Sequence, residues 1–211
     1  MQLNACNCSH TNLQRMGDQL GRESLPVDKI LQIGSEFLVQ LHTTIECDKC
    51  VSTRRVSQAL SQITFRLINF YEAVYADATD NLSSEPSSLC SSSGSGHISA
   101  GRISLQERIN SPTASVVQRH SGCKSVPRDM RLGEMPIIGP EGRLLIRVVL
   151  VDACLELNGK IQELKAVMEE SLGVKDQQYL AQYNGIIGRC LDRLANLIGL
   201  LRLDALATDR S

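Results

Sequence analysis

Apolar residues recur at steps of three and four in two blocks of this chain, and a segment without that pattern separates the blocks. This spacing places apolar side chains on one face of a helix, so each block is expected to form amphipathic helices. From residue 78 to 134 the spacing is lost and Ser, Gly and Pro dominate, as in the run Ser91–Gly96. Such a segment buries too little apolar surface to offset the entropy of ordering it. We therefore predict a mostly disordered insert.

The fold class predicted from this pattern is all-α, a single helical bundle of about five helices interrupted by the insert. Aromatic residues are scarce, with three Phe, four Tyr and no Trp, so the core is expected to consist mainly of Leu, Ile and Val. The N-terminal half of the domain is expected at residues 1–78, the insert at 79–134 and the C-terminal half at 135–205. Helices are expected over 9–22, from Pro26 to the pair at Cys47, from Ser52 or Thr53 to 77, over 141–172 and from Asp176 to 205.

Local signals support these helix ends. Pro26 is tolerated in a first helical turn, and the hydroxyl of Ser52 or Thr53 can accept a hydrogen bond from a free amide of the third helix. Gly173 tolerates the left-handed conformation that follows a helix end. Residues 135–139 are expected to be extended. The side chains expected in the core include Leu38, Leu67, Val148, Leu155 and Leu194.

Four of the eight cysteines form two close pairs, Cys6 with Cys8 and Cys47 with Cys50. Thiolates are good zinc ligands and structural zinc sites have four ligands, so the two pairs are candidate ligands of one structural zinc. The competing interpretation is that these cysteines are small buried residues or form an occasional disulfide. A thioredoxin-like redox site is less favoured, because no βαβ pattern surrounds the second pair. The alternative zinc ligands are His10 and His42.

The charge of the chain is balanced, with a net charge of −1 and no strongly basic block. Nucleic-acid binding by an isolated domain generally needs a basic patch, so we expect no direct, specific DNA binding from this chain alone. No early segment joins a basic start to a long apolar run, as a signal peptide does. No apolar run approaches the roughly 18 residues of a membrane helix. An intracellular protein with no membrane contact is expected.

Two short motifs suggest phosphorylation. Ser111-Pro112 lies in the insert and fits a proline-directed kinase, whose product would carry about −1.5 to −2 additional charge. Arg54-Arg55-Val56-Ser57 resembles a basic-directed site, but Val56 is expected to be buried in a helix, which disfavours modification. No Gly-rich phosphate loop, Ser-His-Asp set or HExxH motif occurs, so no catalytic residues are assigned. Asp152 and Glu156 are one helical turn apart and are expected to be a solvated or capping pair.

Several segments occur in a familiar order. Cys6-Asn7-Cys8 precedes Val27–Leu31, Cys47–Cys50 closes the next helix, Asn69-Phe70-Tyr71 follows, and Ile137-Ile138-Gly139 comes after the Ser-rich insert. Over residues 3–203 this order resembles the regulatory domain of the aflatoxin regulatory protein family. Its members are fungal zinc-cluster transcription factors that control secondary-metabolite gene clusters. The resemblance implies a transcription regulator located in the nucleus, with the cytoplasm as the alternative.

The sequence departs from that family in one respect. Full-length members carry an N-terminal zinc cluster with six cysteines on a basic loop, and nothing in this sequence matches that pattern. We therefore expect a non-enzymatic module whose partner is a zinc-cluster transcription factor or a second copy of itself. The alternatives are a fragment of a full-length factor, or a small helical ligand-binding protein or enzyme with a pocket between helices. No cofactor is expected apart from the candidate zinc.

Overall fold

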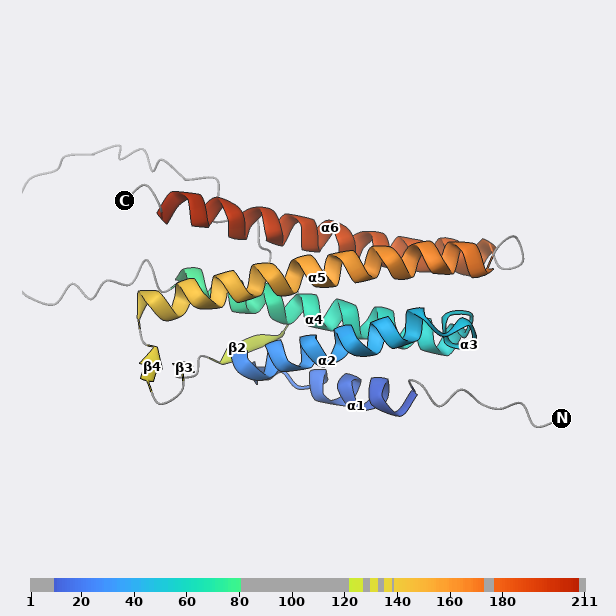
Figure 1. Ribbon diagram of the computed structural model, residues 1–211, viewed down its shortest axis with the longest axis horizontal. Helices are drawn as coiled ribbons and strands as arrows, with labels where there is room; N and C mark the ends of the chain where they lie inside the picture. The colour runs from blue at the N-terminus through green and yellow to red at the C-terminus, as the bar shows by residue number, and fades with distance from the viewer. Residues whose placement is uncertain are drawn as a thin grey trace, which may run out of the picture.

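The computed structural model describes residues 10–80, 122–126, 130–132, 135–137, 139–172 and 177–208. Within these ranges the chain is an all-α bundle of six helices with two pairs of short strands, which confirms the predicted fold class. The long helices lie side by side along the long axis of the molecule (Figure 1). Most of the predicted insert lies outside the described residues.

The N-terminal half contains four helices, of which three were predicted. The third of the four is a single turn that was not predicted. It ends where the Ser52 hydroxyl donates to the Asp48 carbonyl at 2.8 Å and the Thr53 hydroxyl donates to the Lys49 carbonyl at 2.6 Å. These hydroxyls therefore close the short helix, whereas we had expected one of them to cap the next helix. The four are α1 (His10–Leu20), α2 (Val27–Ile45), α3 (Asp48–Val51) and α4 (Arg54–Asp80).

The C-terminal half is a pair of long helices, α5 (Pro140–Leu172) and α6 (Gln177–Thr208), and both were predicted. Gly139 precedes α5 with a φ of +82°, a backbone conformation that glycine adopts without steric cost. Gly173, the predicted stop, lies outside the described residues. The two helices run in opposite directions on one side of the bundle (Figure 1).

The described residues include two pairs of short strands. β1 (Ser24–Pro26) pairs in parallel with β2 (Lys124–Val126), and β3 (Met130–Leu132) pairs antiparallel with β4 (Met135–Ile137). The extended segment at 135–137 was predicted, but β2 and β3 were not, because they fall within the 79–134 segment expected to be mostly disordered. β2 is held to the bundle because Ser125 is buried and its hydroxyl donates to the Asp77 carboxylate of α4. The end of the insert is therefore ordered by tertiary contacts that its composition does not reveal.

One hydrophobic core draws on both sides of the insert. Leu20, Phe37 and Leu67 from the N-terminal half and Leu157 and Leu194 from the C-terminal half are all fully buried in it. The predictions for Leu67 and Leu194 are thus confirmed, and Leu38 is half-buried against the same core. The two helical halves form a single packed unit.

The core face predicted for α5 was wrong in part. Val148 is 52% exposed and Leu155 is 38% exposed, whereas Leu150, Cys154 and Leu157 are fully buried. The first half of α5 is apolar on several sides, so the sequence fits more than one helical face. The neighbouring helices, which the spacing does not specify, decide which face is buried.

α2 and α4 approach each other closely where Gly34 meets Tyr71. Tyr71 is 1% exposed, and a Cβ at Gly34 would overlap its hydroxyl and lie 3.3 Å from its Cζ. Burial, with smaller contributions from Cys154 and Glu156, raises the pKa of Tyr71. Tyr71 therefore stays neutral, and its ring occupies the space that the missing side chain leaves.

Gly34→Ala is expected to destabilise the protein, because the new methyl group overpacks the contact with Tyr71. Overpacking of this kind typically costs about 1–3 kcal/mol. Tyr71→Phe removes the overlapping oxygen, so the double variant should lose less stability than the sum of the two single variants. Urea unfolding of the four proteins measures this, and additive free energies would contradict the assigned contact.

Leu157→Ala and Leu155→Ala separate the observed face of α5 from the predicted one. The first removes a fully buried side chain and should cost about 2–5 kcal/mol. The second shortens a partly exposed side chain and should cost less than about 1 kcal/mol. Thermal unfolding of both variants provides the comparison, and equal losses of stability would show that the helix is rotated relative to the structure.

Candidate functional site

The second cysteine pair lies at the turn between α2 and α4. Cys47 is half-buried and directly precedes α3, Cys50 is 4% exposed, and both thiols are reduced. Within the described ranges no group of three or more His, Cys, Asp or Glu side chains is placed to hold a metal ion. Cys6 and Cys8 lie outside those ranges. The described part thus supplies two of the four predicted thiolates, and the zinc site stays a prediction.

The alternative zinc ligand His42 contacts Glu46 and Lys160. Its Nε2 lies 3.4 Å from a Glu46 carboxylate oxygen, and its Nδ1 lies 3.4 Å from Lys160 Nζ on α5. The contact with Lys160 links the end of α2 to α5. The side chain of His10 is not among those described.

The thiols on the two long C-terminal helices are buried. Burial, assisted by Glu72, raises the pKa of Cys154 to about 12. Burial also raises the pKa of Cys190, although Arg193 and Arg189 act in the opposite direction. The thiolate is the reactive form, so these two residues have the character of packing groups.

The two phosphorylation motifs have different outcomes. Val56 and Ser57 are buried, and the Ser57 hydroxyl donates to the Thr53 carbonyl at 3.0 Å. The guanidinium of Arg54 lies over the Tyr179 ring, 4.9 Å from its centroid. The interpretation that this motif is packed rather than modified agrees with the structure, and Ser111 lies outside the described residues.

A surface groove between α1 and α4 is the main candidate binding site. It has a volume of about 780 Å³. A Cβ at Gly17 would meet nothing within 4 Å, so the absence of a side chain there helps to form the groove. Phe65, on the opposite wall, is 44% exposed. The lining includes Leu13, Gly17, Ala59, Gln62, Phe65 and Arg66.

The charged side chains in this groove are Asp18 and Arg66. Arg66 donates to the Leu20 carbonyl at 3.3 Å, which holds the end of α1 against α4. The other 12 lining residues are uncharged, and four of them are polar, namely Gln14, Gln58, Ser61 and Gln62. The arrangement suits the binding of an apolar surface with a few polar contacts, which is typical of recognition sites.

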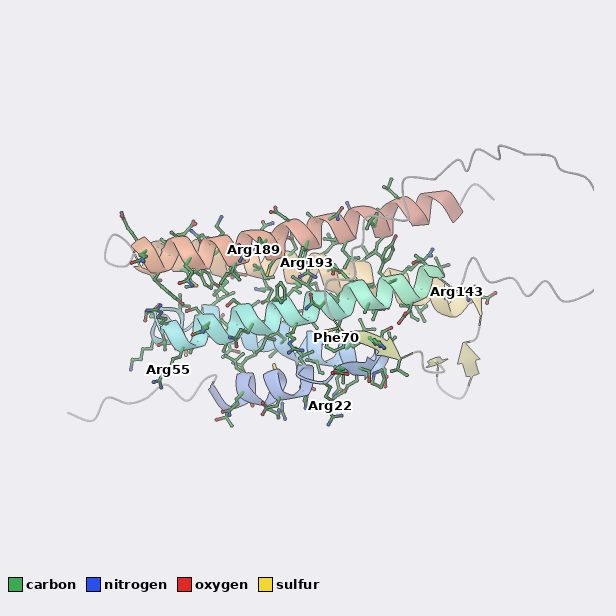
Figure 2. All side chains as sticks on the ribbon, turned by 180° about the vertical axis from the view of Figure 1, so that it is seen from behind. Arg22, Arg55, Phe70, Arg143, Arg189 and Arg193 are labelled. Atoms are coloured by element: carbon green, nitrogen blue, oxygen red, sulfur yellow. The ribbon has the colours of Figure 1, made fainter. Side chains whose placement is uncertain are left out.

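Arg193 of α6 connects the groove region to the rest of the bundle. Its guanidinium donates to both carboxylate oxygens of Glu72, at 2.9 and 2.6 Å, and to Asn69 Oδ1 at 2.6 Å. It also lies over the Phe65 ring, 4.9 Å from the centroid. Figure 2 shows Arg193 where α6 faces α4. A bidentate pair of this kind fixes geometry as well as adding energy.

The Asn69-Phe70-Tyr71 motif therefore has a structural role. Asn69 accepts from Arg193 of α6, Phe70 is fully buried, and Tyr71 fills the space beside Gly34 of α2. Three consecutive residues thus contact different parts of the bundle. The sequence carries no local signal for the partners of this motif, because Gly34 and Arg193 are distant along the chain.

Comparisons with protein-family models, with curated proteins and with solved structures found no match. Among the helices of the described residues, none is long and apolar enough to span a membrane.

Thiol labelling tests the assignment of the cysteines. At pH 8, iodoacetamide should modify the half-buried Cys47 and Cys123 before Cys154 and Cys190, whose raised pKa keeps them protonated. Peptide mass spectrometry locates the label. Labelling in denaturant, where all thiols are accessible, is the control, and fast native labelling of Cys154 would contradict the structure.

Proposed function

We propose that this chain is a non-enzymatic regulatory module that acts in transcription by binding other proteins. The observation that supports it best is the groove between α1 and α4, where Gly17 and the exposed ring of Phe65 leave apolar surface open to a partner. A helix or loop of another protein can fill a groove of this kind. The order of motifs that resembles the aflatoxin regulatory family adds the expectation of a nuclear role in control of a fungal secondary-metabolite gene cluster.

The proposed partner is a zinc-cluster transcription factor, with a second copy of the chain as the alternative. The balanced charge of the chain gives it no strong affinity for DNA phosphates. In the proposed mechanism the partner contacts DNA and this module tunes its activity. The candidate zinc at the cysteine pairs would hold the turn around Cys47 and Cys50 and supply no chemistry to the groove.

A small apolar ligand is the second candidate occupant. The groove volume of about 780 Å³ falls within the range of known small-molecule pockets, about 300–1,000 Å³. This observation supports the alternative of a helical ligand-binding protein. Experiments must therefore establish whether a protein or a small molecule occupies the groove.

Gly17→Leu places a bulky side chain in the groove, and its Cβ meets nothing within 4 Å. It should weaken binding to the zinc-cluster factor encoded nearest to this gene by about tenfold or more. Gly199→Leu is the matched control, because Gly199 is also exposed on a helix with nothing within 4 Å. Isothermal titration calorimetry with the full-length factor measures both affinities, and thermal unfolding checks that both variants remain folded.

Equal binding by the Gly17→Leu variant and the wild type would remove the groove from the proposal. Failure of the wild type to bind the factor, together with saturable binding of an apolar small molecule that Gly17→Leu blocks, would favour the ligand-binding alternative. In a gel-shift assay at physiological salt, the chain alone should not bind promoter DNA specifically. A specific shift that survives competitor DNA would overturn the indirect mechanism.

A further inference from the structure

An apolar stripe is exposed along the first half of α5. Leu144, Val148 and Leu155 are 53, 52 and 38% exposed, and the half-buried Val151 lies between the last two. Steps of four, three and four residues place these side chains in one line on the helix. Single exposed apolar residues are ordinary, but a continuous line of them is typical of an interaction surface.

The stripe lies on the side of α5 that faces α6 farther along the helix. Leu155 and Val148 precede Glu169 by two and three heptads, which keeps them on nearly the same side of the helix. Glu169 accepts a hydrogen bond from Asn184 of α6 at 2.9 Å. Figure 1 shows α5 and α6 close together near their connection and diverging toward the start of α5 and the end of α6. The stripe therefore occupies the part of this side that α6 leaves uncovered.

The outer edge of the stripe is acidic. Glu141, Asp152 and Glu156 are exposed along the adjacent side of α5. The Lys and Arg residues of α5 fall on other sides of the helix at helical spacing. The chain as a whole is nearly neutral, so this negative edge is a local feature.

We propose that this α5 stripe, formed by Leu144, Val148, Val151 and Leu155, is the docking site for an amphipathic helix of a partner protein that carries Lys or Arg along one edge. The apolar face of that helix covers the stripe in the manner of helix-in-groove recognition. Its basic edge meets Glu141, Asp152 and Glu156, which sets orientation and selects the partner. That the occupant belongs to another protein rests on the proposed function.

Charge argues against a second copy as the occupant. In an antiparallel, two-fold pairing of the stripe with itself, the same edge of each helix faces its counterpart across the interface. The acidic edges of both copies would then meet, and like charges across an interface disfavour association. A basic helix avoids this repulsion.

The test uses the full chain and two synthetic helical peptides of about 18 residues, or five helical turns. Both peptides carry Leu at the same i, i+3, i+4 and i+7 positions, and their edge residues are Lys and Arg in one and Glu in the other. Fluorescence anisotropy should show saturable binding of the basic peptide and at least about tenfold weaker binding of the acidic one. Raising the salt concentration from about 50 to 500 mM should weaken the binding of the basic peptide.

Variants locate the binding site. Val148→Asn should weaken binding of the basic peptide by about tenfold, whereas Val39→Asn, at a 67% exposed apolar position on α2, should leave it unchanged. The double variant Asp152→Lys, Glu156→Lys should reverse the preference between the peptides. Equal binding of both peptides to the wild type, or unchanged binding by Val148→Asn, would overturn the proposal.

Other occupants give distinct results. Self-association that Val148→Asn abolishes in sedimentation velocity would assign the stripe to a second copy. Peptide binding seen only after deletion of residues 86–118 would assign it to the chain's own insert. Either result overturns the proposal. The peptide experiment does not involve the zinc-cluster factor. The peptides can therefore fail to bind the stripe while the factor still binds at the groove, so the two proposals can be tested separately.

Discussion

The arrangement of this protein depends on the burial of the central part of α4. α4 contacts α1, α2, α3, α5, α6 and β2, and its five consecutive residues 67–71 are all buried. A helix surrounded in this way must satisfy its polar groups within the protein, because water does not reach them. Ser57 and Ser61 do so by donating to backbone carbonyls four and three residues earlier, those of Thr53 and Gln58. Asn69 instead depends on Arg193 of α6, so the central helix requires a partner from the other half of the chain.

That requirement explains how the two halves act as one unit across a long insert. The cost of closing a loop rises slowly with its length, so a long connection does not prevent the halves from sharing a core. The bidentate contact of Arg193 with Glu72 fixes the register of α6 on α4. On the opposite side, the missing side chain of Gly34 lets α2 approach Tyr71. The segment that follows the insert is held beside α4 by two contacts. β2 pairs with β1, and the Ser125 hydroxyl donates to the Asp77 carboxylate of α4.

The sequence predicted what depends on local spacing. The long helices and the core positions Leu67 and Leu194 follow from apolar residues at steps of three and four. The strand β2 and the single turn α3 were missed, because β2 requires pairing with a distant segment and α3 is too short for periodicity to detect. The groove was missed for a similar reason, since it exists only where α1 packs beside α4. Its one sequence signal was Gly17, a residue that lowers helix stability inside a helix by about 1 kcal/mol.

The exposed stripe of α5 has the same origin as the error in assigning its core face. A helix that only packs against a core needs one apolar face, and the opposite face is usually polar. The first half of α5 has two apolar faces, one containing Leu150 and Cys154 and the other Leu144 and Val148. The fold uses the first and leaves the second exposed beside Glu141 and Asp152. Since apolar surface beyond the needs of the core gains no stability from folding, association with a partner is the step that would bury it, and the acidic edge determines which partners fit.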